Sequence, residues 1–269
     1  MNKLFSLSNK RCVITGSAGL IGQQLSRAIL EAGGYLIMID INGKKLNELE
    51  ELLKKEFSST SIESHSIDVT NERDISTFVR DQETKPIDVL VNNAAINDVF
   101  KENALQESRF EKYSFDLWKK SLDVNLSSVF LMCQIVGSKM SKQGGGSIIN
   151  ISSTYGLVAP DQTLYLDKNG KQLFYKSPSY PVAKAGVIAL TKYCASYWGR
   201  DNVRVNVICP GGVKDKQDSY FIDQYSKRTL LGRMASPKDY NGAVVFLASN
   251  ASEYMTGGIL VVDGGWTAC

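Results

Sequence analysis

The chain has 269 residues, 43% of them hydrophobic, and a formal net charge of +3. This length suits a single α/β domain, and the small charge, spread along the chain, argues against binding to nucleic acid or to an anionic membrane. Its five cysteines form no CxxC motif and its one histidine is His65. We therefore expect reduced cysteines in a cytoplasmic protein, no metal site, and no signal peptide or membrane-spanning helix.

Apolar, strand-like runs alternate with longer segments of helical periodicity. The expected strands cover residues 11–15, 35–40, 61–69, 87–95, 146–153, 203–211 and part of 257–265. The first expected helix follows the glycine-rich turn and ends at about residue 31. The others span residues 44–57, 72–82, 115–140, 179–199 and 237–249. This alternation predicts a Rossmann-type, doubly wound α/β fold, in which a parallel sheet of about seven strands has helices on both faces and forms a single domain over 1–269.

One segment, residues 155–178, interrupts this alternation. It is polar and contains glycine and proline, and it lies between the fifth strand and the following helix. In open α/β sheets, ligands bind beyond the carboxyl ends of the strands. We therefore expect 155–178 to be an insertion near the substrate site and interpret it as a loop that covers the substrate.

A glycine-rich turn, TGSAGLIG (15–22), follows the first strand and opens a helix. Gly16, Gly19 and Gly22 would let the backbone approach a pyrophosphate at the helix N-terminus, although a tight strand–helix connection would look the same. Asp40 ends the second strand, where a carboxylate would accept hydrogen bonds from ribose and repel a 2′-phosphate, or would simply form a turn. Asp40 favours NAD over NADP, and Asp68 could bond the adenine or cap the next helix.

Tyr180 and Lys184 are spaced i and i+4 on a predicted helix, so they share one face. Such a pair also arises by chance in a chain of this composition. A tyrosine with a pKa of about 10 needs help to exchange a proton near neutrality, and a nearby ammonium favours the phenolate. Ser153, at the carboxyl end of the fifth strand, could orient a substrate oxygen.

The order of these motifs resembles the short-chain dehydrogenase/reductase family over essentially the whole chain. The matching segments are TGSAGLIG, Asp40, Asp68–Val69, NNAA (92–95), DVNLSS (123–128), NISS (150–153), YPVAK (180–184), RVNVICPGG (204–212) and GGILVVDGG (257–265). The resemblance implies that Tyr180 is the general acid/base and that Lys184 lowers its pKa and bonds the nicotinamide ribose. It further implies that Ser153 holds the substrate oxygen and that Asn125 anchors a water that relays protons. The other cofactor contacts implied by the resemblance are Leu20, Ile21, Val69, Asn92, Ala94, Pro210, Gly211 and Val213.

Three positions depart from the commonest family pattern. Leu20 stands where the second loop glycine is usual, a spacing similar to the branch that acts on sugar nucleotides. NNAA ends in Ala95 instead of glycine, and Asp215 replaces the threonine that often follows the PG motif. These departures leave the catalytic residues intact.

The leading hypothesis is an NAD-dependent oxidoreductase that interconverts a secondary alcohol and a ketone. Lysines in the insertion and a similarity to reductases of bacterial surface-sugar and flagellin-glycan pathways suggest a sugar phosphate or nucleotide sugar as substrate. The alternatives are a small or acyl ketone as substrate, an epimerase or dehydratase with tightly bound NAD, and a non-catalytic NAD sensor. The candidate substrate contacts are Ser153, Tyr180, Tyr165, Lys168 and Lys171. Apolar faces on helices 115–140 and 179–199 predict a homodimer or homotetramer.

Overall fold

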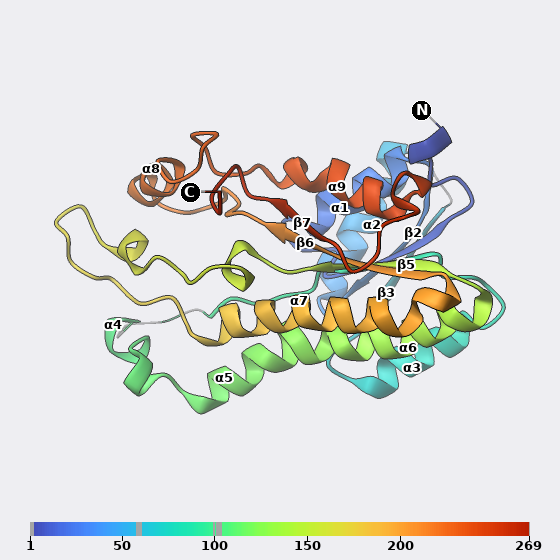
Figure 1. Ribbon diagram of the computed structural model, residues 1–269, viewed down its shortest axis with the longest axis horizontal. Coiled ribbons are helices and arrows are strands. Elements are labelled where there is room, and N and C mark those ends of the chain that lie inside the picture. The colour runs from blue at the N-terminus through green and yellow to red at the C-terminus, as the bar shows by residue number, and fades with distance from the viewer. Residues whose placement is uncertain (1–2, 58–60, 99, 101–103, 269) are drawn as a thin grey trace.

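The computed structural model describes residues 3–57, 61–98, 100 and 104–268, and its strands form one parallel sheet (Figure 1). The seven strands lie in the order β3-β2-β1-β4-β5-β6-β7. Their bounds are Arg11–Thr15 (β1), Tyr35–Asp40 (β2), Ile62–Ser66 (β3), Val89–Asn92 (β4), Gly146–Ile151 (β5), Val203–Pro210 (β6) and Ile259–Val262 (β7). The predicted Rossmann-type fold is thus confirmed. The strand order reverses between β1 and β4, the position at which such sheets bind ligands.

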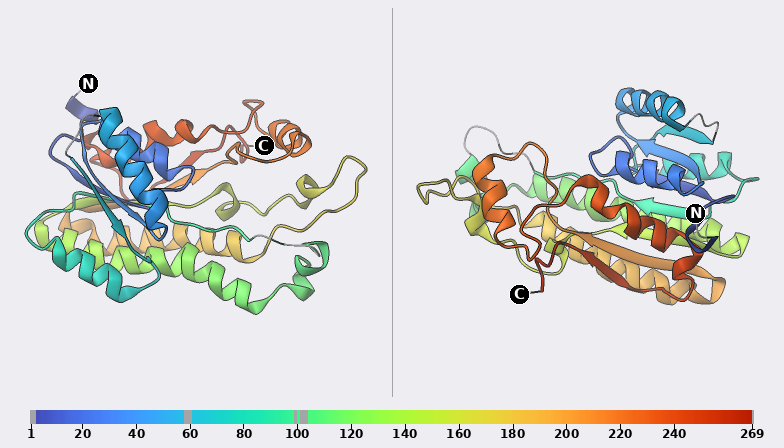
Figure 2. Two further views of the ribbon diagram at one scale, coloured as in Figure 1. Left: turned by 180° about the vertical axis from the view of Figure 1, so that it is seen from behind. Right: turned by 90° about the horizontal axis from the view of Figure 1, so that it is seen from above.

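Helices cover both faces of the sheet (Figure 2). One face carries α1 (Gly22–Glu31), α2 (Gly43–Phe57) and α9 (Asn241–Ala248), and the other carries α3 (Glu72–Asp81), α6 (Ser128–Gln143) and α7 (Ser179–Trp198). Successive strand residues point to opposite faces: Cys12 and Ile14 pack under α1, whereas Val13 packs under α6 and α7. Because both faces are covered, the strands read as continuous apolar runs.

The helix expected over 115–140 is divided. A short helix α5 (Phe115–Leu122) joins α6 through a π-helical turn at Asp123–Ser127. The combined stretch Phe115–Gln143 is long and apolar enough to cross a membrane by length and composition alone. However, Met132, Val136 and Met140 pack into the core beneath the sheet, as in a covering helix of a globular domain.

Several other bounds differ from the expected ones. Strands β3 and β4 are shorter than predicted, and the helix expected over 237–249 consists of a 3-10 turn, Pro237–Tyr240, followed by α9. Two short helices, α4 (Ala104–Glu107) and α8 (Ser219–Ser226), were not predicted. Helix α8 matters for function, because it borders the cavity described below.

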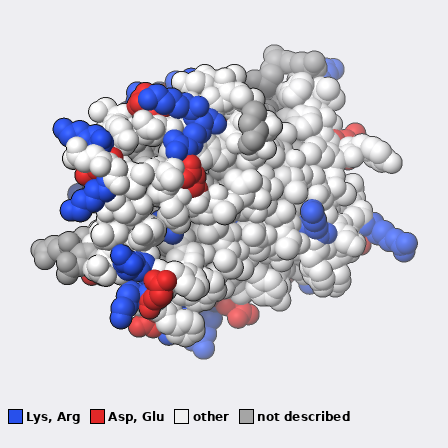
Figure 3. All heavy atoms as spheres, turned by 60° about the vertical axis from the view of Figure 1, so that its left-hand side comes forward, with Lys and Arg blue, Asp and Glu red and all other residues white. Residues whose placement is uncertain are grey.

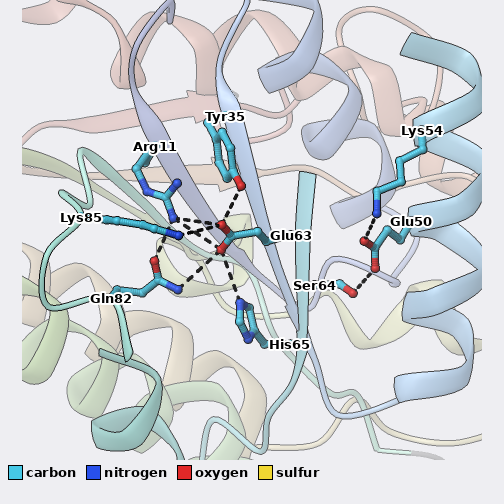
Figure 4. A network of polar contacts seen from close by, with 9 residues as sticks. All are labelled: Arg11, Tyr35, Glu50, Lys54, Glu63, Ser64, His65, Gln82 and Lys85. Atoms are coloured by element: carbon cyan, nitrogen blue, oxygen red, sulfur yellow. Dashed lines mark hydrogen bonds and ion pairs between the residues drawn. The ribbon is translucent and has the colours of Figure 1, made fainter. Parts of the chain in front are cut away.

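A polar network stabilises the edge of the sheet around β3, near the amino ends of the strands (Figure 4). Glu63 accepts a hydrogen bond from the Tyr35 hydroxyl at 2.6 Å and pairs with Arg11 at 3.4 Å and Lys85 at 3.5 Å. Burial acts to raise the pKa of Glu63, but these partners outweigh it and hold the pKa below its usual value. The network lies at the opposite ends of the strands from the cavity, so its role is structural.

The four cysteines that the structure describes, Cys12, Cys133, Cys194 and Cys209, are buried and free. Burial raises the pKa of the Cys209 thiol to about 11. These residues act as small apolar side chains in the core.

Candidate active site

A cavity of about 980 Å³ opens beyond the carboxyl ends of the strands. One end is lined by the glycine-rich loop after β1 and by Asp40 at the end of β2. The other end is lined by Ser153 and Tyr180. The cavity therefore joins the predicted nucleotide end to the predicted chemical end.

The glycine-rich loop lies against the segment that follows β4. Gly16 adopts φ +65°, and a Cβ there would stand 2.7 Å from the Cα of Ala94. Any other residue would therefore push these two loops apart. Gly19, Leu20 and Ile21 line the cavity, whereas Gly22 begins α1 behind the loop.

Asp40 points its carboxylate at this loop. Its Oδ2 accepts a hydrogen bond from the Ala18 amide at 3.0 Å, and its Oδ1 accepts one from the Asn42 amide at 2.9 Å. Each carboxylate oxygen can accept a second hydrogen bond, so Asp40 can still receive ribose hydroxyls in the cavity. The following residue, Ile41, is 69% exposed and brings no cation to this position.

Asp68 and Val69 also line the cavity. Asp68 accepts hydrogen bonds from the backbone and the hydroxyl of Thr70, while Asn71 is the residue that caps α3. Asp68 therefore does not serve as the helix cap, the alternative considered from the sequence.

The prediction that Asn92 lines the cofactor cleft is wrong. Asn92 is buried below the cavity and donates a hydrogen bond to Asn150 Oδ1 at 2.8 Å. Its neighbour Asn93 lines the cavity instead and donates to the carbonyl oxygens of Thr15 and Gly16. Side chains alternate between the two faces of a strand, which is why the neighbouring asparagine takes the position. Ala94 does line the cavity, as predicted.

At the chemical end, Tyr180 and Lys184 lie on α7 with the Lys184 Nζ 5.7 Å from the tyrosine ring centroid. Lys184 is 2% exposed, and its Nζ donates a hydrogen bond to the Ile151 carbonyl at 2.8 Å. Burial lowers the pKa of Lys184 to about 8. Burial raises the pKa of Tyr180, whereas a hydrogen bond with Ser153 acts to lower it. Ser153 and Tyr180 thus bond each other, and Lys184 lies beside the tyrosine ring. Because the pKa of Tyr180 stands above its usual value, the lowering by Lys184 that the resemblance implies is not seen in this structure.

The two serines that end the β5 segment have different surroundings. Ser152 is buried and its hydroxyl donates to the Lys184 carbonyl at 2.8 Å, which fixes the strand to α7. Both serines line the cavity, and the Ser153 Oγ accepts a hydrogen bond from the Tyr155 amide at 3.1 Å. Because the Ser152 hydroxyl already donates to Lys184, Ser153 is the serine whose hydroxyl proton is free for a ligand.

Asn125 lies in the π-helical turn and is fully buried. Its Oδ1 accepts from the Ile96 amide at 2.9 Å and its Nδ2 donates to the Ile96 carbonyl at 3.0 Å. The side chain therefore ties the α5–α6 helix to the segment that follows β4. Single π-helical turns are frequent at functional sites, because they shift the backbone hydrogen-bond ladder.

The segment after β6 closes the remaining wall. Pro210, Gly211 and Val213 line the cavity together with Asp215, which stands in the place of the threonine usual in this motif. The Tyr225 hydroxyl of α8 accepts a hydrogen bond from the Gly212 amide at 2.5 Å. Helix α8 is thereby attached to the segment that would pass the nicotinamide.

A protein-family model described as enoyl-(acyl carrier protein) reductase matches residues 16–267. The match spans the glycine-rich loop, the π-helical turn and the Tyr180–Lys184 pair. The chain belongs to the short-chain dehydrogenase/reductase family. Among its relatives, the 2-dehydro-3-deoxy-D-gluconate 5-dehydrogenase of Bacillus subtilis (strain 168) is 33% identical over 275 residues, which cover 99% of this chain and 98% of that protein.

Two solved structures of similar proteins have the same fold. A short-chain dehydrogenase from Leptospira borgpetersenii serovar Hardjo-bovis (strain JB197), with bound NAD+, gives a TM-score of 0.85 at 32% identity, covering 99% of this chain and 96% of that one. A gluconate 5-dehydrogenase from Burkholderia cenocepacia J2315, in complex with NADP and tartrate, gives 0.86 at 30% identity, covering 99% and 98%. As a short-chain dehydrogenase/reductase, this chain is an oxidoreductase that uses a nicotinamide dinucleotide.

In this short-chain dehydrogenase/reductase, the 155–178 segment, predicted to be an insertion and called so below, forms a wall of the cavity. Near its start, Gly156 packs closely against α7: a Cβ at this position would stand 2.8 Å from the Lys184 carbonyl. Tyr165 packs on Phe174 and on Phe221 of α8, with ring centroids 4.8 and 5.8 Å apart. The Arg228 side chain pairs with Asp161 at 2.8 Å. The insertion and α8 therefore share a small core of their own.

Of the three substrate contacts predicted in this insertion, one lies at the cavity and two do not. Tyr165 lines it, and its hydroxyl lies 3.2 Å from that of Tyr155, which lines it too. Lys168 and Lys171 do not line the cavity: both are exposed, near a turn stabilised by Asp167. Lys176, which was noted in the sequence but not chosen as a contact, does line it.

Charged side chains are sparse over much of the end of the molecule that carries the insertion and α8 (Figure 3). Lysines and arginines gather in separate groups, with acidic residues among them, and much of the surface between them is uncharged.

Proposed function

We propose that this protein is an NAD-dependent dehydrogenase that interconverts a secondary alcohol and a ketone in a small, polyhydroxylated substrate derived from a sugar. The observation that carries the proposal is the placement of Ser153, Tyr180 and Lys184 in one cavity with the glycine-rich loop and Asp40. This arrangement fits a dinucleotide lying along the sheet edge with its nicotinamide beside Tyr180.

The chain's own residues would move the proton. When bound, the nicotinamide accepts or donates the hydride. Ser153 would hold the substrate oxygen, and Tyr180 would take its proton during oxidation or return one during reduction. Lys184 would favour the phenolate through its charge and would bond the nicotinamide ribose. A water that connects Lys184 to solvent would have to bind the main chain of Asn125, because both groups of its side-chain amide already bond Ile96. A positioned acid/base of this kind contributes roughly 10²–10⁴-fold in rate.

The preference for NAD is inferred from Asp40 and Ile41. A carboxylate at the end of β2 would repel a 2′-phosphate, and no lysine or arginine occupies the glycine-rich loop to offset that repulsion. The similar solved structures contain NAD+ in one case and NADP in the other. Comparing the KM values for NAD and NADP tests this choice directly, and a lower KM for NADP would contradict it.

The substrate class is inferred from similar proteins. The relative from Bacillus subtilis acts by its name on 2-dehydro-3-deoxy-D-gluconate, and the Burkholderia enzyme by its name on gluconate. Both names support a sugar acid or a related polyol. A sugar phosphate or nucleotide sugar stays a candidate, as does a small or acyl ketone. An epimerase or dehydratase with the same residues would retain its NAD through purification, which distinguishes it from a dehydrogenase.

Absorbance of the reduced nicotinamide tests the activity. The purified protein is mixed with NAD or NADH and a panel of sugar acids, polyols and the corresponding ketones. The Tyr180→Phe variant should lower kcat by about 10²–10⁴-fold, because it removes the exchangeable proton, and should keep the wild-type Kd for NADH. A variant with full activity would show that Tyr180 is not the acid/base.

We also infer that the protein is cytoplasmic and forms a homodimer or homotetramer. The four free cysteines support the first inference. The exposed aromatic residues on α6 and α7 support the second and are taken up in the Discussion.

A further inference from the structure

Lys176 brings a second ammonium group to the catalytic tyrosine. It lies at the end of the insertion, four residues before Tyr180, and lines the same cavity. Its Nζ stands 4.7 Å from the centroid of the Tyr180 ring, closer than the Nζ of Lys184 at 5.7 Å. A substrate whose oxygen meets Tyr180 must therefore lie near Lys176 as well.

The Lys176 ammonium forms a hydrogen bond but no ion pair with a carboxylate of the described residues. Its Nζ donates a hydrogen bond to Asn97 Oδ1 at 2.8 Å. Within 3–57, 61–98, 100 and 104–268, no carboxylate lies within ion-pair distance of it. A charge withdrawn from water is costly unless an opposite charge accompanies it.

Asp98 is the acidic group that acts on Lys176. It lines the cavity, and its Oδ2 accepts a hydrogen bond from the Tyr113 hydroxyl at 2.5 Å. Burial lowers the pKa of Lys176 to about 8, and the charge of Asp98 only partly opposes this effect. Lys176 is therefore charged at neutral pH but incompletely compensated, so an anion entering the cavity would be favoured there.

The backbone of Lys176 is held in place by the insertion. The Gln162 side chain accepts a hydrogen bond from the Lys176 amide at 2.8 Å and donates one to its carbonyl at 3.4 Å. A side chain whose backbone is fixed in this way loses less freedom when it binds a ligand. Lys168 and Lys171, on the same insertion, have no such position at the cavity.

We propose that Lys176 determines substrate specificity by binding an anionic group, a carboxylate or a phosphate, on the carbon chain that is oxidised or reduced at Tyr180. This inference rests on the proposed dehydrogenase function and narrows its substrate class to anionic sugar derivatives. The anionic group pairs with the Lys176 ammonium while the reacting oxygen lies between Ser153 and Tyr180.

Binding of unreacted probes tests the inference without turnover. D-gluconate (a carboxylate), D-glucose 6-phosphate (a phosphate) and D-sorbitol (an uncharged chain of the same length) are titrated against the full chain with NADH, and the Tm is followed. At least one of the two anions should raise the Tm of the wild type, and which one does so identifies the anionic group. Lys176→Met should lower the affinity for that anion at least 10-fold and leave any response to sorbitol unchanged.

Two variants serve as controls. Lys168→Met removes an exposed lysine of the same insertion and should keep the wild-type response, while Lys176→Arg should retain most of it because the charge remains. The Tm of Lys176→Met without ligand should be no lower than that of the wild type, since the variant removes a charge that is partly withdrawn from water. An unchanged anion response in Lys176→Met, no anion response in the wild type, or an equal loss for sorbitol would overturn the inference.

Kinetics separate this inference from the function on which it rests. Lys176→Met should lower kcat/KM for an anionic substrate at least 10-fold more than for an uncharged polyol, mainly through KM. An equal fall in kcat for both substrates would mean that Lys176 acts on Tyr180 and not on the substrate. If no alcohol or ketone is turned over by the wild type, the proposed function fails, whatever the anion binding shows.

Discussion

The buried charge of Lys184 destabilises the folded protein. Its ammonium is almost fully enclosed, with the Ile151 carbonyl as its hydrogen-bond acceptor at 2.8 Å. Burial lowers the pKa of Lys184 to about 8, whereas an unfolded lysine has a pKa of about 10.4. The folded protein thus holds this proton less tightly than the unfolded chain does.

This difference predicts how stability changes with pH. Between pH 8 and about 10 the unfolded chain keeps the proton that the folded protein has released, so the free energy of unfolding should rise with pH. Lys184→Met should flatten this rise by about 1–3 kcal/mol. Urea denaturation at pH 8, 9 and 10 measures it, with Lys192→Met, on the exposed side of α7, as the control. Parallel curves for the wild type and Lys184→Met would contradict the assignment.

The sequence alone identified Tyr180, Lys184, Ser153 and the glycine-rich loop as candidates, because each belongs to a motif with fixed spacing on a predicted element. Asn92 was misplaced, since the motif names two adjacent asparagines and only the strand geometry decides which one is buried. The choice of Lys168 and Lys171 over Lys176 failed for a similar reason. An irregular segment has no periodicity from which the side facing the cavity can be read.

At the scale of elements, the long helices and the seven strands followed from periodicity, whereas α8 and the π-helical turn did not. Helix α8 spans only Ser219–Ser226, too short for a clear amphipathic pattern, and its contacts come from the insertion. The π-helical turn adds one residue to a turn inside an otherwise regular apolar helix. Both features depend on tertiary packing, and both border the cavity or tie elements near it.

Because the polar network around β3 is centred on the Glu63 carboxylate, we expect its contribution to the free energy of unfolding to depend on pH. Glu63→Gln should lower the free energy of unfolding by about 1–2 kcal/mol at pH 7, because a neutral amide would leave Arg11 and Lys85 without their carboxylate. The pKa of Glu63 is lowered in the folded protein, so its stabilisation is present above pH of about 4.3 and is lost as pH falls through the folded-state value.

Chemical denaturation at pH 7 and pH 3 measures this difference. The gap between the free energies of unfolding of wild type and Glu63→Gln should be smaller at pH 3 than at pH 7, because the unfolded chain takes up a proton at Glu63 more readily than the folded protein does. Glu48→Gln, at an exposed position of α2, serves as the control and should change stability by less than about 0.5 kcal/mol. A gap of the same size at both pH values would show that the charge of Glu63 is not what stabilises the edge.

At the scale of the whole molecule, one helical face presents aromatic and apolar side chains to solvent. Phe115 begins α5, Phe130 lies on α6, and Val182, Tyr193 and Tyr197 lie on α7, each between 46% and 69% exposed. Tyr193 and Tyr197 stack with their ring centroids 6.1 Å apart. Exposed apolar surface of this kind marks sites of protein association.

We therefore expect this face to pack against a second copy of the chain. Light scattering at micromolar concentration should give a dimer or a tetramer, and Tyr193→Glu/Tyr197→Glu should shift the mass toward the monomer, because charges would be buried without partners. Lys192→Glu, also on the exposed side of α7, controls for the added charge. A wild-type monomer at that concentration would contradict the expectation.

The attachment of the 155–178 insertion has a consequence for how this enzyme could acquire new substrates. The insertion begins after Ser153, which β5 fixes, and ends before Tyr180, which α7 fixes, while Gly156 closes its base against Lys184. Under the role proposed for Lys176, part of substrate recognition lies in a stretch of chain separate from Ser153, Tyr180 and Lys184. Replacing the stretch between Gly156 and Ser179 would then change this part of the cavity wall and leave the catalytic residues at the same places, so a new substrate could be accepted without a change in the reaction.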